Sequence, residues 1–237
     1  MKSIKIIVAI GLCLLLAGCN YRTKSSINTG ALQTVIIDIT DALVVPDEPA
    51  FYNSIDSNIW EPLTVNITCI TENDVNKVST LSLPAENYLF GNRSIREARI
   101  MKFKKDVHLE IEKLIAKGQN GQQHSIIYRT VAKQMNWLSQ QKGNHKSVYL
   151  YSDLLENDDL NGFNFYSPVC FKLLQTNPAL VQKSLEQSCR LNNLKGVELY
   201  LIFTPKTYTE NFRYIILARF FKRVFESHGA SVFIGMQ

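Results

Sequence analysis

The feature that most constrains the fold of this chain is its alternation of short apolar segments with longer segments of helical periodicity. The apolar segments predict strands at residues 34–38, 63–71, 77–83, 148–153, 197–203 and 231–235. Helices are predicted between them, at residues 94–117, 125–141, 178–193 and 210–227. Apolar strands that alternate with amphipathic helices are typical of a mainly parallel sheet covered on both faces.

We therefore expect an α/β fold, with a doubly wound, mainly parallel sheet between two layers of helices. The first predicted helix carries a single apolar stripe, formed by Phe103, Val107, Ile111, Leu114 and Ile115. Only a short polar stretch, residues 72–74, separates the second and third strands. This spacing favours a hairpin, and hence one antiparallel strand at the edge of the sheet.

The N-terminus has the organisation of a secretory signal. Lys2 and Lys5 precede an apolar run at residues 6–16, which is too short to span a bilayer and ends in small residues before Cys19. The sequence Leu-Ala-Gly-Cys at residues 16–19 resembles the lipobox of bacterial lipoproteins, in which the cysteine is acylated and becomes the first mature residue. The alternative is an ordinary secretory signal that happens to contain a cysteine.

This resemblance implies a lipid-anchored protein of the bacterial cell envelope. We expect a signal peptide at residues 1–18, a lipidated polar tether at residues 19–31 and one folded domain at residues 32–237. Asn20, rather than an aspartate, follows the cysteine. This favours the outer membrane over the inner membrane and leaves the orientation of the domain open.

The net charge of the mature chain indicates which classes of partner it can bind. The net charge of +5 falls to +3 when Lys2 and Lys5 leave with the signal, and no basic run is interleaved with aromatic residues. We therefore expect no nucleic-acid partner.

Three cysteines remain after Cys19, in a compartment that permits disulfides. Cys69 lies in an apolar run and is expected as a buried thiol, whereas Cys170 and Cys189 could pair or stay reduced.

Two aspartates stand where predicted strands end. Asp38 closes the first strand, and Asp153 closes the fourth. Ligands of parallel sheets bind beyond the carboxyl ends of the strands, so each carboxylate could meet a ligand or a cation there. Each could instead cap the segment that follows it.

The residues around these positions resemble von Willebrand factor A-type domains. The sequence Asp38-Ile-Thr40-Asp-Ala42 is similar to the Asp-x-Ser-x-Ser motif that follows the first strand in that family. Ser125 lies in a polar loop before a helix, and Asp153 ends a later strand. The order of strands and helices agrees over nearly the whole mature chain. The resemblance implies one divalent cation held by Asp38, Thr40, Ser125 and Asp153.

This chain departs from the family pattern at two places. Ala42 stands where the second serine belongs and offers no side-chain oxygen. Residues 44–62 contain three prolines and make a poor long helix, so the first helix is expected to be short or broken. The remaining carboxylates and hydroxyls would form a hard oxygen site suited to Mg²⁺, with Mn²⁺ or Ca²⁺ as alternatives.

Three functions remain open. The first is a binding module, in which the metal joins an unidentified envelope protein; this predicts no enzymatic activity. The second is a metal-dependent phosphoesterase, which would need further carboxylates beside the strand-end pair; Asp41, Glu156, Asp158 and Asp159 are the nearest in sequence. The third is a structural lipoprotein that retains the fold without the metal.

Overall fold

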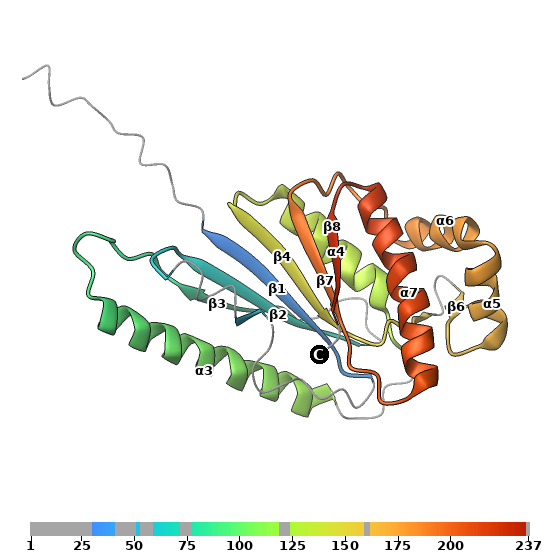
Figure 1. Ribbon diagram of the computed structural model, residues 1–237, viewed down its shortest axis with the longest axis horizontal. Coiled ribbons are helices and arrows are strands. Elements are labelled where there is room, and N and C mark those ends of the chain that lie inside the picture. The colour runs from blue at the N-terminus through green and yellow to red at the C-terminus, as the bar shows by residue number, and fades with distance from the viewer. Residues whose placement is uncertain are drawn as a thin grey trace, which may run out of the picture.

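The computed structural model describes residues 30–40, 51–52, 59–71, 77–118, 124–158 and 162–235. Its centre is a six-stranded sheet in the order β3-β2-β1-β4-β7-β8 (Figure 1). The strands are β1 (Ala31–Asp38), β2 (Leu63–Ile70), β3 (Ser79–Leu83), β4 (His145–Tyr151), β7 (Val197–Ile202) and β8 (Ser231–Gly235). All neighbours pair in parallel except β2 and β3, which are antiparallel. The expected fold class is confirmed.

The middle strands are buried on both faces, as their sequences predict. β1 pairs with β2 on one side and with β4 on the other, and its residues from Gln33 to Asp38 are all buried. The chain winds away from β1 in one direction through β2 and β3, and in the other through β4, β7 and β8. The order of the strands therefore reverses between β1 and β4, and ligands of doubly wound sheets bind at such a point.

The helices cover the two faces unequally (Figure 1). α3 (Arg93–Gly118) packs on β2 and β3 on one face. α4 (Ile127–Gln140) and α7 (Tyr208–Ser227) cover the other face, together with α5 (Pro168–Thr176) and α6 (Pro178–Ser188). Three layers result, with the larger share of helical mass on the α4 and α7 face.

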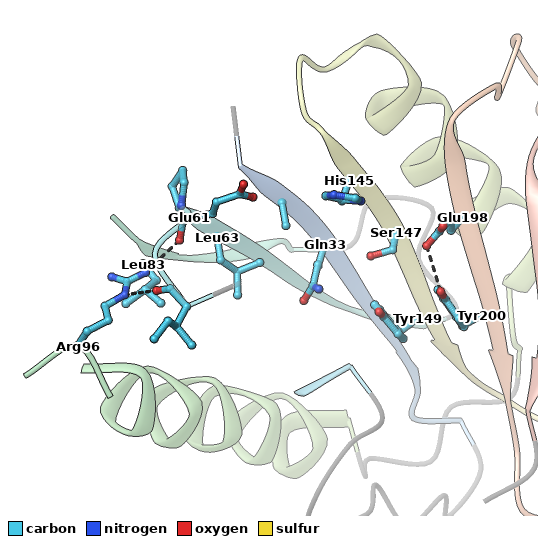
Figure 2. Close-up of a pocket in the computed structure, with 13 residues that line it drawn as sticks. Gln33, Glu61, Leu63, Leu83, Arg96, His145, Ser147, Tyr149, Glu198 and Tyr200 are labelled. Carbon is cyan, nitrogen blue, oxygen red and sulfur yellow. Dashed lines mark hydrogen bonds between the residues drawn. The ribbon is translucent and has the colours of Figure 1, made fainter. Parts of the chain in front are cut away.

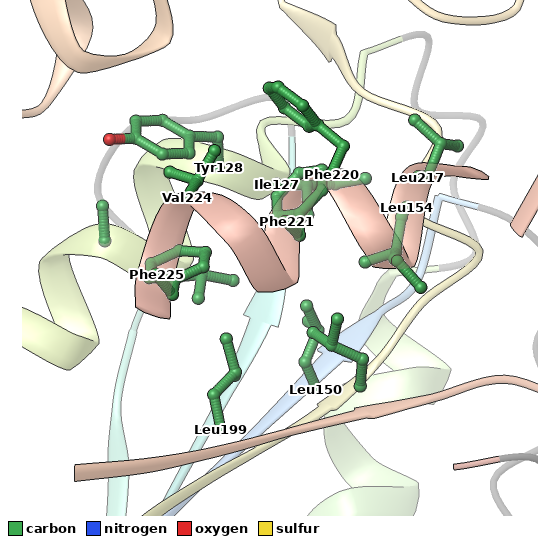
Figure 3. Packing of buried hydrophobic residues seen from close by; sticks show 14 of the residues in the cluster. Ile127, Tyr128, Leu150, Leu154, Leu199, Leu217, Phe220, Phe221, Val224 and Phe225 are labelled. Atoms are coloured by element: carbon green, nitrogen blue, oxygen red, sulfur yellow. The ribbon is translucent and has the colours of Figure 1, made fainter. Parts of the chain in front are cut away.

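Each face has its own apolar core. On the α4 and α7 face, Leu150 and Leu199 of the sheet lie beneath Ile127, Leu217 and Phe221 (Figure 3). On the opposite face, a second core is formed by Val35, Ile37, Ile67, Phe103, Val107 and Ile111. The last three belong to the predicted stripe of α3, so the periodicity identified the buried side of that helix.

Several elements depart from the predicted boundaries. α6 ends at Ser188 rather than at residue 193, and β4 begins at His145 rather than at residue 148. α5 and the small hairpin of β5 (Asn157–Asp158) and β6 (Phe163–Asn164) were not predicted. α5 begins at Pro168, and Asn177 caps α6 by accepting from the Leu180 amide.

The predicted signal peptide, Cys19, residues 20–29 of the predicted tether, Ala42 and the predicted hairpin connection at residues 72–74 lie outside the described residues, as do most of residues 44–62. β1 begins at Ala31, close to the predicted boundary between tether and domain. Within the described parts of the chain, no helix combines the length and apolar character that a membrane crossing requires.

Candidate functional site

The carboxylate of Asp38 is the centre of a cluster of polar side chains at the C-terminal edge of the sheet. Asp38 ends β1 and is only 2% exposed. Its Oδ1 accepts a hydrogen bond from the Thr40 hydroxyl at 2.6 Å and one from the Thr40 amide at 3.2 Å. Its Oδ2 accepts from the hydroxyl of Ser152 at 2.8 Å and from that of Ser125 at 3.2 Å. Three hydroxyls therefore converge on one buried carboxylate.

These hydroxyls come from three separate segments of the chain. Thr40 follows β1, and Ser152 follows β4, the neighbouring strand. Ser125 precedes α4 and is fixed by a pair of backbone hydrogen bonds with Asn157, both of 3.0 Å. The cluster thus lies between β1 and β4, where the strand order reverses.

Burial changes the acidity of Asp38. Loss of hydration raises the pKa of its carboxyl above the ordinary value of 3.8, while the hydrogen bonds from Thr40, Ser152 and Ser125 act in the opposite direction. Burial is the larger effect, so the hydroxyls only partly compensate the negative charge. A cation near Asp38 would therefore stabilise the charged form.

The backbone turns sharply just after Ser152. Leu154 is fully buried and has a φ of 66°, a left-handed conformation that leucine rarely adopts. The Ser152 hydroxyl accepts from the Leu154 amide at 2.9 Å while it donates to Asp38. Such strain persists only where the surrounding structure enforces it, and it is frequent at functional sites.

Asp153 is placed differently from the other predicted ligands. Its Oδ1 accepts from the Leu155 amide at 2.9 Å, as a residue that caps a turn does. It also lines a cavity of about 190 Å³ with Phe203 and residues at the start of α7, among them Glu210 and Arg213. The structure therefore brings three of the four predicted ligands, Asp38, Thr40 and Ser125, into one cluster, and places Asp153 beside a neighbouring cavity.

Two further acids near the cluster have structural partners. Glu156 is fully buried and accepts from the Tyr128 amide at the start of α4, at 2.6 Å. Asp158 pairs with Arg129 at 2.7 Å, and both side chains are almost completely buried. Asp41 and Asp159 lie outside the described residues. Over the described ranges, no group of three or more His, Cys, Asp or Glu side chains is placed to hold a metal ion.

The three cysteines in the described part of the chain, Cys69, Cys170 and Cys189, are free thiols in the structure. Cys69 is buried in β2, as expected, and burial together with the charge of Asp38 raises its pKa to about 12, so it is unreactive at neutral pH. Cys170 and Cys189 both pack against the larger core. A disulfide between them stays a prediction.

A second cavity, of about 180 Å³, lies on the α3 face near the opposite, N-terminal edge of the sheet (Figure 2). Gln33 and Ser147 line its floor from β1 and β4, and the rings of Tyr149 and Tyr200 stack beside them at 4.7 Å. The Tyr200 hydroxyl donates to Glu198 at 3.0 Å. Sequence reasoning missed this cavity, although polar and aromatic residues alternate with apolar ones in β4 and β7.

No family model matches the chain, and no curated protein matches its sequence. Among solved structures, the chain is similar to the SpRpn10 VWA domain, with 9% identity over 87% of this chain and 88% of that chain and a TM-score of 0.36. It is also similar to an aerotolerance-related membrane protein from Bacteroides fragilis NCTC 9343, with 10% identity over 87% and 92% and a TM-score of 0.39. Neither likeness bears on the chemistry around Asp38.

Proposed function

We propose that this chain is a lipid-anchored protein of the bacterial cell envelope whose domain binds a partner protein at the C-terminal edge of its sheet. The observation that carries the proposal is the convergence of Thr40, Ser125 and Ser152 on the buried carboxylate of Asp38. The cluster lies between β1 and β4, the position at which doubly wound sheets bind their ligands.

The chemistry of these donors fits a divalent cation, with Mg²⁺ first and Mn²⁺ or Ca²⁺ as alternatives. Carboxylate and hydroxyl oxygens are hard ligands, and protein Mg²⁺ sites commonly use one or two carboxylates together with water. In this proposal Asp38, Thr40 and Ser125 hold the ion and Ser152 joins them. Asp153, the fourth predicted ligand, accepts from the Leu155 amide and lines the neighbouring cavity, so its part in binding the ion is tested separately below. A bound ion would leave a coordination position for an acidic side chain of the partner.

A metal-free binding surface is the second candidate, because one observation favours it. The two oxygens of Asp38 already accept four hydrogen bonds, so the cluster is satisfied by the protein alone. A hydrolytic role is less well supported. Glu156 and Asp158, two of the carboxylates that it would need, bind the start of α4 and Arg129 instead.

The N-terminal sequence supports the anchored location. A basic start, an apolar run and a small-residue motif precede Cys19, and ten residues separate Cys19 from Gly30. A single acyl chain gives only marginal membrane binding, so a stable anchor requires more than one. In this proposal Cys19 carries the anchor and the polar tether connects it to β1.

The test is isothermal titration of the purified full chain in detergent with Mg²⁺ and with Mn²⁺. We expect saturable binding by the wild type and at least a tenfold weaker affinity for Asp38→Asn, which keeps the shape of the side chain and removes its charge. If Asp153 binds the ion, Asp153→Ala should also weaken the affinity for it. If Asp153 only caps the turn, the affinity should not change. Ser147→Ala is the matched control, because Ser147 is a buried serine at the other end of β4.

Capture of the partner by crosslinking in membranes, with and without a chelator, completes the test. Partner capture that depends on Asp38 and is lost with the chelator supports the metal-bridged contact. Capture that depends on Asp38 and survives the chelator, with no heat of metal binding, supports the metal-free surface. Phosphodiester turnover that requires Asp38 would contradict both binding proposals.

A further inference from the structure

Three consecutive large apolar side chains stand in solvent between β3 and α3. Tyr88 is 73% exposed, Leu89 78% and Phe90 87%. We call these three residues the apolar tip. Ile95, in the first turns of α3, is also half exposed. Contiguous exposed apolar side chains of this size usually mark a surface that meets a partner or a membrane.

The backbone of the apolar tip is held in a defined turn. The side-chain oxygen of Asn87 accepts from the amides of Leu89 and Phe90, at 2.8 and 3.3 Å, and the Gly91 amide donates to the Asn87 carbonyl at 2.7 Å. The ring of Trp60 occupies the space that a Cβ on Gly91 would need. The turn therefore displays its apolar side chains on a fixed support.

The apolar tip lies at the same end of the molecule as the start of β1 (Figure 1). The Glu86 amide donates to the Trp60 carbonyl, and two residues further along, the Pro62 carbonyl accepts from the Ala31 amide. The N-terminal edge of the sheet is thus continuous from the tip to Ala31. A tether that joins Cys19 to Gly30 spans at most about 40 Å when fully extended, which keeps this edge close to any membrane that holds the anchor.

The charges beside this edge are also suited to a lipid surface. The Asn144 amide donates to the Gly30 carbonyl, and this contact places the start of β4 beside the tether. Lys142 is exposed there and Lys146 is half-buried. Basic side chains next to a membrane are attracted by anionic lipid headgroups. Arg93, the first residue of α3, is exposed but is paired with Glu97.

We propose that the apolar tip inserts into the surface of the bilayer that carries the lipid anchor. Aromatic and aliphatic side chains that project from a rigid turn suit the boundary between headgroups and acyl chains. Insertion gives the domain a fixed orientation, with the N-terminal edge on the membrane and the Asp38 cluster directed away from it. This inference rests on the anchor in the proposed function, and it adds a second contact with the bilayer.

The experiment uses the full lipidated chain in vesicles of phosphatidylcholine and phosphatidylglycerol that contain brominated acyl chains, which quench tryptophan fluorescence on contact. Phe90→Trp places the probe at the tip. Tyr208→Trp is the matched control, because Tyr208 is 84% exposed at the start of α7, at the C-terminal edge. The unsubstituted chain gives the baseline for Trp60 and Trp137.

We expect emission from position 90 to shift to shorter wavelength and to be quenched several-fold more than emission from position 208. Leu89→Ser in the Phe90→Trp chain should reduce that quenching while leaving the circular dichroism spectrum unchanged. Equal quenching at the two positions, in a chain that floats with the vesicles, overturns the insertion and leaves the anchor intact. A chain that does not float overturns both. A blue shift at position 90 in native membranes without lipid quenching assigns the tip to a protein partner and also overturns the insertion.

Discussion

A buried charged side chain lies at the centre of each edge of the sheet, and the two side chains differ in kind. At the N-terminal edge, Arg96 of α3 is fully buried. Its guanidinium donates to the carbonyls of Ile59, Glu61 and Pro84 and contacts the carboxylate of Glu86. At the C-terminal edge, Asp38 is 2% exposed and accepts from three hydroxyls and one amide.

The difference shows which edge is suited to respond to a ligand. An arginine stays charged at all accessible pH values, and the partners of Arg96 are mainly backbone carbonyls, which can only accept hydrogen bonds. An aspartate can be neutralised by a proton or balanced by a cation. Hydroxyl groups both donate and accept, so those around Asp38 could turn their oxygens toward a bound ion. The N-terminal edge is therefore a fixed support, and the C-terminal edge is the candidate binding surface.

The largest effect is expected at the fixed support. Arg96→Ala removes the donor shared by three backbone carbonyls and by Glu86, and we expect it to lower the free energy of unfolding by about 3–5 kcal/mol. Urea denaturation of the full chain measures this loss. Arg99→Ala is the control, because Arg99 also contacts Glu86 but is 57% exposed, and its loss should cost less than about 1 kcal/mol. Equal effects of the two variants would contradict a structural role for Arg96.

A smaller effect is expected at the binding surface. Ser152→Ala removes one hydrogen bond to the buried carboxylate and one acceptor for the Leu154 amide. We expect a loss of about 1.5–3 kcal/mol, the range for hydrogen bonds to charged groups. Ser147→Ala, at a buried position in β4, should change the free energy of unfolding by about 1 kcal/mol or less. A Ser152→Ala chain as stable as the wild type would show that Asp38 does not depend on this hydroxyl.

Most of the fold could be predicted because each strand or helix is indicated by residues that are close together in the sequence. The apolar segments predicted the six strands of the sheet, and the stripe containing Phe103 and Val107 predicted the buried side of α3. α5 and the β5–β6 hairpin were missed for a physical reason. The hairpin strands have two residues each and so show no period. α5 has only nine residues, of which Leu174 alone is buried, so the helix is too short to show a clear apolar stripe.

The candidate site was predicted only in part, because its geometry depends on side-chain direction. Asp38, Thr40 and Ser125 converge as expected, but Ser152, rather than the adjacent Asp153, contacts Asp38. Successive side chains of a strand point to opposite faces, and the left-handed Leu154 then turns the chain. Arg96 did leave a signal: it lies seven residues before Phe103, on the buried stripe, where a charged residue needs partners.

The smallest effect, a dependence on pH, distinguishes the two buried charges most directly. Burial raises the pKa of Asp38 above 3.8, so the folded chain keeps this proton at pH values where the unfolded chain has lost it. Above pH 3.8 the unfolded state therefore binds fewer protons at this group than the folded state does. The contribution of Asp38 to the free energy of unfolding consequently falls as the pH rises through the folded pKa. Arginine side chains in general keep their charge over this range, so a slope of this sign points to the Asp38 edge.

We therefore expect the stability of the wild type relative to Asp38→Asn to decrease as the pH rises above about 4, as measured by urea denaturation at a series of pH values without divalent cations. Asp106→Asn, at a partly exposed position on α3, controls for the loss of one carboxylate at the surface. If Mg²⁺ binds at Asp38, its addition at pH 7 should raise the stability of the wild type and leave Asp38→Asn unchanged. A relative stability that increases with pH would mean that the hydroxyls outweigh burial, and the C-terminal edge would then be a satisfied hydrogen-bond cluster that, like the Arg96 support, needs no ligand.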